Sequence, residues 1–349
     1  MSKVRIAIVG AGAIGRAHAE VIATGEVAAL AAIVDPTEAG RAVAGRYGVP
    51  WLADQDALLA AGGVDAALVA TPNQTHLPVS LAFIARGIPV LVEKPIASTL
   101  AEGRALTEAS EKAGVAVLVG HHRRHNPIVK RARELVRSGT LGRLTSVSVL
   151  STFLKPDSYF ELEWRRRTGG GPVLINLIHE IDLIRFVCGE IDAVLAVTSN
   201  KVRGFEVEDS AAVILRLASG ALVTINVSDT AAAPWSWDMS SRESPLYPAL
   251  PAPVNSHYLS GTAASLTLPQ LELWRYPGKA GWHEPIAREI VEVARADPYA
   301  EQIRHLCAVT RGEEQPVITA ADGTRTLEAT LAVHEAARIG APVALSYGQ

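Results

Sequence analysis

The chain has 349 residues, of which 48% are hydrophobic and 20% are charged, and its formal net charge is −3. This length and apolar content predict two domains with sizeable cores. The balanced charge excludes the basic surface of a nucleic-acid-binding protein and the basic tail that binds anionic membranes. Cys188 and Cys307 lie far apart without a Cys-x-x-Cys pair, so neither a disulfide framework nor a thiolate metal site is expected.

The first residues lead directly into an apolar stretch, Val4–Val9, without the charged segment or cleavage site of a secretory signal. No apolar run approaches the roughly 20 residues that span a bilayer. We therefore expect a cytoplasmic protein that has neither a membrane nor a nucleic acid as its partner.

Up to residue 122, short apolar runs alternate with stretches rich in Ala, Leu, Glu and Arg. Nearly all-apolar runs are typical of strands buried on both faces of a parallel sheet, and the intervening composition favours helices. The predicted strands are Val4–Val9, Ala28–Val34, Asp65–Ala70, Val90–Val92 and Ala116–Val119. The predicted helices are Ile14–Thr24, Thr37–Tyr47, Thr75–Arg86 and Ala101–Ala113. The pattern predicts an α/β fold whose N-terminal domain, residues 1–122, is a doubly wound Rossmann domain.

From residue 123 onward, strands follow one another with little helix between them. They are predicted at Leu144–Thr152, Ala193–Asn200, Ala211–Leu217 and Ala221–Ser228, the last two joined by a turn at Ser219-Gly220. The predicted helices are Asn126–Ser138, Asn176–Val187, Pro298–Arg311 and Asp322–Ile339. Five prolines predict a long irregular loop at Pro234–Pro253. Residues 123–349 are thus expected to form an α+β domain with an open, mostly antiparallel sheet that binds substrate and mediates oligomerisation.

A glycine-rich turn joins the first predicted strand to the first predicted helix. Gly10 allows the tight turn, Gly12 lets the backbone approach a pyrophosphate, and Gly15 lets helix and strand pack closely. Together with Ala13 and Ile14, these residues begin a helix whose N-terminal N–H groups suit a phosphate. The turn therefore predicts a dinucleotide-binding loop.

Asp35 ends the second predicted strand, 20 residues beyond Gly15, where a carboxylate accepts hydrogen bonds from the adenosine ribose. A carboxylate there repels a 2′-phosphate, and the next residue is Pro36 rather than a residue that binds one. NAD is the expected cofactor, with NADP as the alternative because Arg41 and Arg46 lie on the following helix.

Polar residues also follow three later strands of the same predicted sheet. Ligands of open α/β sheets bind at the carboxyl ends of the strands, so these residues are expected to face the cofactor or substrate. The three segments are Thr71-Pro72-Asn73-Gln74-Thr75-His76, Glu93-Lys94-Pro95 and Gly120-His121-His122.

These motifs resemble those of the glucose–fructose oxidoreductase/inositol dehydrogenase (GFO/IDH/MocA) family. The resemblance rests on the glycine loop, the Thr71–His76 and Glu93–Pro95 segments, Arg124-His125-Asn126-Pro127, and Gly169-Gly170-Gly171 followed by His179-Glu180-Ile181-Asp182. It implies a Rossmann domain, a C-terminal domain with an open sheet, and NAD(P)-linked oxidation of hydroxyl groups on sugars, polyols or related rings.

Alcohol oxidation needs a base for the hydroxyl proton and positive charge near the developing alkoxide. Lys94 is the candidate for orienting and polarising the substrate oxygen, and the resemblance aligns His179 with the base of the family. Imidazole titrates near neutral pH and is suited to that role. Without the resemblance, a solvated lysine and an ordinary helical histidine are the simpler interpretations.

The chain departs from the family four residues before His179. Many relatives have a carboxylate or amide there, whereas this chain has Ile175 followed by Asn176. Residues three apart on a helix are neighbours, so Asn176 is a candidate for binding substrate or orienting the base. Asp182 is a second candidate for orienting His179, with an ordinary polar helix position as the alternative.

Further candidates precede the glycines or lie near residue 123. Trp164 and Arg165 are expected to contact substrate, Arg124 to line the cleft, and His122 to contact the cofactor. No metal is expected although several histidines cluster, because the family chemistry is metal-free. The aromatic residues in or beside the proline-rich loop suit a ring substrate or, alternatively, pack the loop or form a subunit contact; they are Trp235, Trp237, Tyr247 and Tyr258.

The sequence thus predicts an NAD-dependent dehydrogenase of a secondary hydroxyl on a cyclic polyol or sugar. The alternatives are a dehydrogenase of a cyclic diol or hydroxy acid, such as a dihydrodiol, and a non-catalytic NAD-binding regulator. Apolar residues on both sides of strands such as Ala211–Leu217 predict a homodimer or homotetramer built through the C-terminal sheet.

Overall fold

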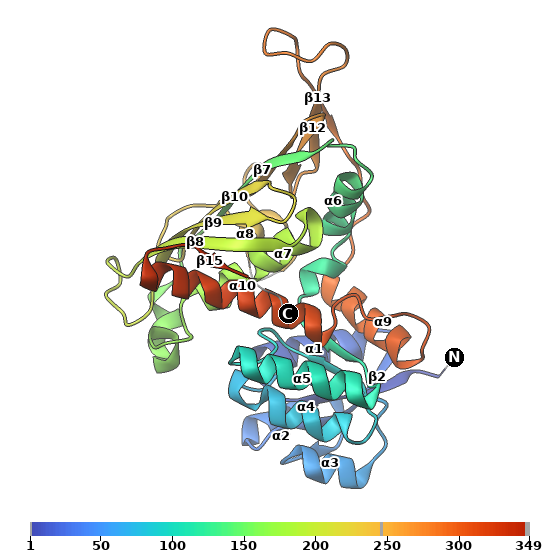
Figure 1. Cartoon of the computed structure of the whole chain (residues 1–349). Coiled ribbons are helices and arrows are strands. Elements are labelled where there is room, and N and C mark those ends of the chain that lie inside the picture. Colours follow the sequence, from blue (N-terminus) through green and yellow to red (C-terminus); the bar gives the residue numbers. More distant parts are fainter. Residues whose placement is uncertain (1, 245–246, 346–349) are drawn as a thin grey trace. The chain divides into compact units, whose positions relative to one another are not determined.

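The computed structural model describes residues 2–244 and 247–345 of the chain (Figure 1). It consists of two compact units, each assembled from two separate stretches. The first unit comprises residues 1–125 and 296–327, and the second comprises residues 126–295 and 328–349. The first unit therefore includes residues 296–327, which the sequence analysis assigns to the second domain.

The first unit contains a six-stranded parallel sheet in the order β3-β2-β1-β4-β5-β6. Its strands are β1 (Val4–Val9), β2 (Ala28–Val34), β3 (Trp51–Leu52), β4 (Ala66–Val69), β5 (Val90–Val92) and β6 (Val117–Val119). The order reverses between β1 and β4, as in a doubly wound sheet, so loops that follow neighbouring strands meet at one edge. The five predicted strands are confirmed, and only the two-residue β3 was not predicted.

The helices of the first unit pack around this sheet. They are α1 (Ala13–Thr24), α2 (Glu38–Tyr47), α3 (Gln55–Ala61), α4 (His76–Ile84), α5 (Leu100–Ala113) and α9 (Pro298–Thr310). Thr99 and Glu102 form a capping box at the start of α5. Apolar side chains of α9, including Ile303 and Leu306, belong to the same core as Ile6 and Ile8 of β1.

The second unit contains a nine-stranded sheet in the order β14-β13-β12-β11-β7-β10-β9-β8-β15. All neighbours are antiparallel except β7 and β10. The strands are β7 (Leu144–Thr152), β8 (Ile191–Ser199), β9 (Ser210–Leu217), β10 (Leu222–Ser228), β11 (His257–Gly261), β12 (Ala264–Leu268), β13 (Glu272–Arg275), β14 (Ala287–Ile290) and β15 (Val343–Ala344). The mostly antiparallel sheet is confirmed, but β11 to β15 were not predicted.

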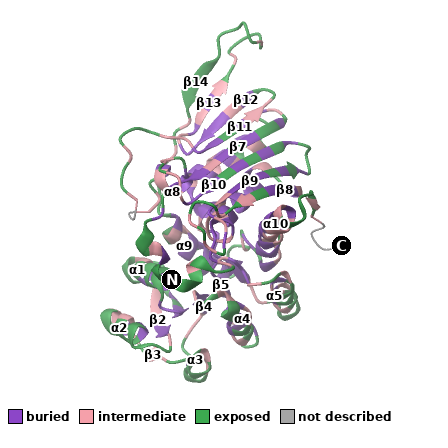
Figure 2. Ribbon diagram, turned by 90° about the vertical axis from the view of Figure 1, so that its left-hand side faces the viewer, coloured by how far each residue is buried: buried purple, intermediate pink, exposed green. Residues whose placement is uncertain are grey.

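Helices cover one face of this sheet. They are α6 (Pro127–Arg137), α7 (Ile178–Cys188) and α10 (Ala320–Ile339), whose first residues belong to the first unit. A short helix, α8 (Trp237–Ser240), interrupts the predicted irregular loop, part of which, residues 245–246, lies outside the described residues. Residues of the central strands alternate between buried and exposed (Figure 2), so only one face of the sheet belongs to the core. Within the described part of the chain, no helix is long and apolar enough to cross a membrane.

Candidate functional site

Close backbone contacts fix the glycine loop that joins β1 to α1. Gly10 has a φ of 96°, and a Cβ atom there would lie 2.6 Å from the carbonyl oxygen of Ala70. A Cβ atom on Gly15 would collide with the carbonyl oxygen of Gly10. Gly12, in contrast, is exposed, and a Cβ atom there would meet no described atom within 4 Å. The fold thus requires glycine at positions 10 and 15, whereas position 12 leaves open space beside the N-terminus of α1.

This open space fits the pyrophosphate of a dinucleotide. Gly12 precedes α1, whose first turn carries no acidic residue, so nothing there opposes the positive end of the helix dipole. Ala13 and Ile14 are exposed beside it. The residues present therefore match the group that the sequence predicts.

Asp35, at the end of β2, holds the glycine loop in place. Its carboxylate accepts hydrogen bonds from the backbone N–H of Ala11 at 2.8 Å and of Thr37 at 2.9 Å, and from the Thr37 hydroxyl. Burial opposes ionisation of Asp35, but these hydrogen bonds lower its pKa. A Cβ atom on Gly40 of α2 would collide with the Asp35 side chain. Asp35 is thus an ionised carboxylate fixed beside the loop.

His76 connects the loops that follow β4 and β5. Its Nδ1 atom lies 2.9 Å from the carbonyl oxygen of Pro95, and its Nε2 atom lies 2.9 Å from that of Thr71. Burial lowers the pKa of His76 and favours a neutral ring, which donates to only one of the two carbonyls. His76 is buried and braces these loops, whereas Pro72 is exposed and Asn73 begins a turn of 3₁₀ helix.

Glu93, at the end of β5, connects the Glu-Lys-Pro segment to the helix that follows the glycine loop. Its Oε1 atom lies 2.8 Å from Nε2 of His18 on α1, and its Oε2 atom accepts a 3.1 Å hydrogen bond from the backbone N–H of Lys94. Both side chains are buried, and Gly120 has no room for a Cβ atom because Glu93 fills the space. The His18 partner lowers the pKa of Glu93 despite its burial. His18 was not predicted, because no local pattern marks a helical histidine as the partner of a distant strand end.

Lys94 itself is half-buried at the carboxyl end of β5. His122, after β6, stacks on Tyr299 of α9 with ring centroids 4.4 Å apart. The structure therefore brings together the predicted residues of the first unit through a chain of contacts. These residues are Gly10, Gly15, Asp35, Thr71, His76, Glu93 and Lys94.

Arg124 is buried, and its guanidinium forms an ion pair with Asp322 within the first unit. This pair fixes the guanidinium against Asp322, and the predicted contact of Arg124 with substrate stays a prediction. The neighbouring His125 ring packs against His305 of α9, with centroids 5.2 Å apart.

In the second unit, a turn of π-helix, Val173–Leu177, leads into α7. Asn176 and His179, three residues apart, are half-buried, whereas Asp182 is fully buried. Both side chains are therefore partly accessible, and their placement as neighbours beside the substrate stays a prediction. The buried Asp182 lies away from solvent, and its role in orienting His179 stays a prediction.

Lys155, which the sequence analysis missed, lies next to Asn176. Its ammonium is 2.7 Å from Oδ1 of Asn176 and 3.3 Å from Oδ2 of the buried Asp229. Arg203 also pairs with Asp229, at 3.3 Å, and donates to the carbonyl oxygen of Lys155. A single lysine after a strand gives no sign in the sequence that it is buried.

Glu208 explains the third glycine of the Gly169-Gly170-Gly171 motif. A Cβ atom on Gly171 would collide with the Glu208 carboxylate. This carboxylate accepts a 2.9 Å hydrogen bond from the backbone N–H of Val173 and lies 3.3 Å from Nε2 of His334. Glu208 therefore anchors the start of the helical segment that carries Asn176 and His179.

Two other predicted substrate residues lie on the 3₁₀ turn before these glycines. Trp164 is exposed. Arg165 stacks on Tyr159, with its guanidinium 3.9 Å from the ring centroid, and donates to the Tyr159 carbonyl oxygen.

The aromatic residues of the proline-rich loop differ in exposure. Trp235 is half exposed, whereas Trp237 is fully buried and donates to Glu243. Trp237 is thus a core residue, and the interpretation as a ring-binding face is wrong for it.

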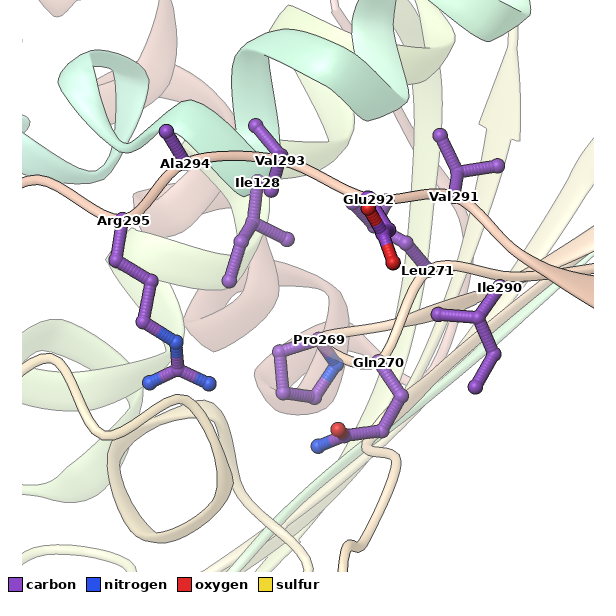
Figure 3. Close-up of a pocket in the computed structure, with 10 residues that line it drawn as sticks. All are labelled: Ile128, Pro269, Gln270, Leu271, Ile290, Val291, Glu292, Val293, Ala294 and Arg295. Carbon is purple, nitrogen blue, oxygen red and sulfur yellow. The ribbon is translucent and has the colours of Figure 1, made fainter.

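A cavity of about 530 Å³ lies elsewhere in the second unit (Figure 3). None of the predicted site residues lines it. Its walls come from α6, the segment before β13, and β14 with the chain beyond it, namely Ile128, Pro269, Gln270, Leu271, Ile290, Val291, Glu292, Val293, Ala294 and Arg295. In this unit, the volume of a cavity therefore does not indicate where the predicted substrate-binding residues lie.

The parallel sheet, the glycine loop and Asp35 define the class of the first unit, a Rossmann-type dinucleotide-binding unit. Comparison with known families agrees. The model of an oxidoreductase family with an NAD-binding Rossmann fold, GFO_IDH_MocA, matches residues 4–121. The model of the GFO/IDH/MocA C-terminal domain matches residues 129–243.

Individual proteins are also similar. The rhizopine catabolism protein MocA of Rhizobium meliloti is 32% identical over 201 residues, which cover 58% of this chain and 62% of that protein. Inositol 2-dehydrogenase of Rhizobium meliloti strain 1021 is 32% identical over 64% of this chain and 68% of that enzyme. The crystal structure of GenD2 from gentamicin A biosynthesis, in complex with NAD, is 26% identical, with a TM-score of 0.77 over 99% of this chain and 97% of that one.

The chain belongs to the GFO/IDH/MocA family of NAD-binding oxidoreductases. The predicted fold class, family and NAD cofactor are therefore confirmed. The residues of the site and the substrate are matters for proposal.

Proposed function

We propose that this protein is an NAD-dependent dehydrogenase that oxidises a secondary hydroxyl group of a cyclic polyol or sugar. The observation that carries the proposal is the position of Lys94 at the carboxyl end of β5. Its backbone is held by Glu93, which His18 of the phosphate-loop helix fixes in turn. Lys94 is therefore anchored to the same framework as the cofactor loop. The inositol dehydrogenase among the relatives supports the class of substrate.

The proposed roles follow from the chemistry of alcohol oxidation. Bound NAD supplies the acceptor for the hydride that leaves the carbinol carbon. The Lys94 ammonium orients the reacting oxygen and stabilises its negative charge, and the His179 imidazole takes the hydroxyl proton. The C–H and O–H bonds break while the carbonyl bond forms, so one hydride and one proton leave the substrate. Asn176 contacts the substrate beside His179.

The test is Lys94→Ala, assayed by NADH formation on a panel of inositols and hexoses. We expect kcat to fall by about 10²-fold or more, because a charged group at the reacting oxygen is removed. NAD binding should persist, since the glycine loop and Asp35 are unchanged. Lys112→Ala, on the exposed side of α5, is the matched control. Near-wild-type turnover of Lys94→Ala would contradict the mechanism.

A second candidate is a dehydrogenase of a cyclic diol or hydroxy acid, favoured by the apolar Ile175 next to Asn176. Substrate profiling separates the two, because activity confined to dihydrodiols or hydroxy acids would exclude the polyol proposal. A non-catalytic NAD-binding regulator is the third candidate, and it would show NAD binding without turnover of any compound. Predicted contacts of Trp164 and Arg165 with substrate, and the cytoplasmic location, stay predictions.

The protein is further proposed to form a homodimer or homotetramer through the sheet of the second unit. The face opposite the helices exposes large apolar side chains on four of the five neighbouring strands from β11 to β8. They are Val197, Ile214, Leu222 and Tyr258. Such a face is commonly covered by a second subunit.

A further inference from the structure

The buried ammonium of Lys155 determines which end of the Asn176 amide is accessible. Lys155 is 6% exposed, and its Nζ atom lies 2.7 Å from Oδ1 of Asn176. Its other neighbours are the Asp229 carboxylate at 3.3 Å and the Tyr159 ring, whose centroid is 4.7 Å away. Burial and the nearby Arg203 guanidinium lower the pKa of Lys155. The ion pair with Asp229, the amide oxygen and the aromatic face all stabilise the ammonium form.

An ammonium group only donates hydrogen bonds, so it accepts nothing from the amide NH2 of Asn176. The amide oxygen must therefore face Lys155, and the NH2 group lies on the other side of the amide carbon. The Asn176 side chain is half-buried, and among the described residues no acceptor for its NH2 group is found. Asn176 thus presents a hydrogen-bond donor one helical turn before His179.

The side chain of the preceding residue, Ile175, is a hydrocarbon and offers no hydrogen-bond acceptor. A substrate hydroxyl that accepts a hydrogen bond from Asn176 still has its own proton to place, and in the proposed mechanism the His179 imidazole is already engaged by the reacting hydroxyl. A carboxylate or carbonyl oxygen has no proton to place. A donor without a neighbouring acceptor therefore favours an oxygen that only accepts hydrogen bonds.

We propose that Asn176, oriented by Lys155, selects substrates that carry a carboxylate or carbonyl oxygen next to the reacting hydroxyl. This inference rests on the proposed function, since it places substrate beside His179. In it, Asn176 is a specificity-determining residue and Lys155 is a positioning residue. The favoured substrates are sugar acids and keto-polyols rather than neutral polyols.

The test exchanges a single group. Asn176→Asp keeps the shape of the side chain and its oxygen on Lys155 but replaces the NH2 donor by a carboxylate oxygen. Binding is measured in the Lys94→Ala background, from the fluorescence of bound NADH, so the readout does not require turnover. The probes are matched pairs, D-glucose with D-glucuronate and D-galactose with D-galacturonate for the carboxylate, and myo-inositol with its 2-keto derivative for the carbonyl.

We expect the acceptor-bearing member of at least one pair to bind about ten- to hundredfold more tightly, as for a hydrogen bond to a charged or strongly polar group. In Asn176→Asp, the two members of the pair should bind equally, or the hydroxyl member should bind more tightly. Lys155→Met should bring the ratio close to one, because the amide is then free to turn over, while Asp229 keeps its contact with Arg203. Gln315→Glu adds the same negative charge at an exposed position of the first unit and should leave the ratio unchanged.

The inference would be overturned if the hydroxyl members bound as tightly as, or more tightly than, their carboxylate or carbonyl counterparts. It would also be overturned if the ratio of affinities were unchanged in Asn176→Asp, or if no probe bound. Its failure is distinguishable from failure of the proposed function. Lys94-dependent turnover of inositol with an unchanged ratio would reject only the inference. A ratio that responds to Asn176→Asp without NAD-dependent turnover of any compound would reject only the dehydrogenase.

Discussion

Two glycines of the same loop, Gly12 and Gly15, have different surroundings in the structure. Gly15 is required by the fold, because its Cα lies against the carbonyl of Gly10. Gly12 is not, because its missing side chain would point into open space. Substitution by alanine at the two positions should therefore separate folding from cofactor binding.

Gly12→Ala should leave the melting temperature without cofactor unchanged and weaken NAD binding by about tenfold or more, since a methyl group would occupy the space where a pyrophosphate approaches. Gly15→Ala should lower the melting temperature even without NAD, because the backbone must shift. Thermal melts with and without NAD, together with NAD titration, measure both effects. A loss of stability in Gly12→Ala equal to that in Gly15→Ala would contradict this division.

Glu93 makes the stability of the protein depend on pH. Its pKa is lowered below the ordinary value of 4.5, so the folded state favours the carboxylate. The stabilisation is complete above 4.5 and is lost as the pH falls through the lower folded value. Below 4.5, the melting temperature of the wild type should fall more steeply than that of Glu93→Gln. Glu108→Gln, an exposed control on α5, should follow the wild type, and parallel curves for all three proteins would disprove the role of Glu93.

Glu208 lies just before β9 and connects that part of the chain to the start of the helical segment that carries His179. Hydrogen bonds from Val173 and from His334 lower the pKa of Glu208 despite its burial. Glu208→Ala should remove about 1–3 kcal/mol from the free energy of unfolding, because the backbone N–H of Val173 loses its partner. Glu208→Gln should cost less, since its amide oxygen still accepts. Urea unfolding of both variants tests this order, and equal losses would argue against the hydrogen bond.

The elements that repeat a strong local pattern were predictable from the sequence. The strands β1, β2 and β5 are runs of apolar residues bounded by polar turns, and their predicted bounds match the structure. The strands β11 to β14 were missed because residues such as Ser260, Ser265 and Thr267 break the apolar pattern, and pairing across the sheet decides their structure. Propensity is weak there, and tertiary context dominates.

The same limit applies to the candidate site. Gly10, Asp35 and Lys94 occupy positions that a motif fixes relative to a strand end, so the sequence identifies them. His18, Lys155 and Glu208 gain their importance from partners 75, 21 and 35 residues away. No local pattern encodes such separations, and only the folded chain reveals them.

Subunits are proposed to associate through the outer face of the second sheet, which is the face opposite the helices. Ile214 lies in the middle of β9, opposite Thr224 on one neighbouring strand and Leu195 on the other. Ile214→Glu should reduce the mass in solution to that of a smaller assembly, because an unpaired charge would be buried at the interface. Light scattering measures the mass, with Ala105→Glu, which adds the same charge on the exposed side of α5 in the first unit, as a control. A monomeric wild type would contradict the proposal.

The division of the chain also predicts which fragments fold. Residues 1–122 alone lack α9, whose Ile303 and Leu306 complete the core of the first unit. This fragment should melt without a cooperative transition. Residues 1–125 joined by a short flexible linker to residues 296–327 should melt cooperatively and bind NAD. Circular dichroism melts of both fragments test this, and a cooperative transition in the shorter fragment would show that α9 is dispensable.

The return of the chain to the first unit has a consequence for its synthesis. A ribosome releases residues in order, and domains near the N-terminus generally fold first. Here the segment 296–327 emerges only after residues 126–295 of the second unit. The nascent nucleotide-binding unit must therefore wait, with part of its apolar core uncovered, until translation is nearly finished, and it is during this interval that chaperones would be needed most.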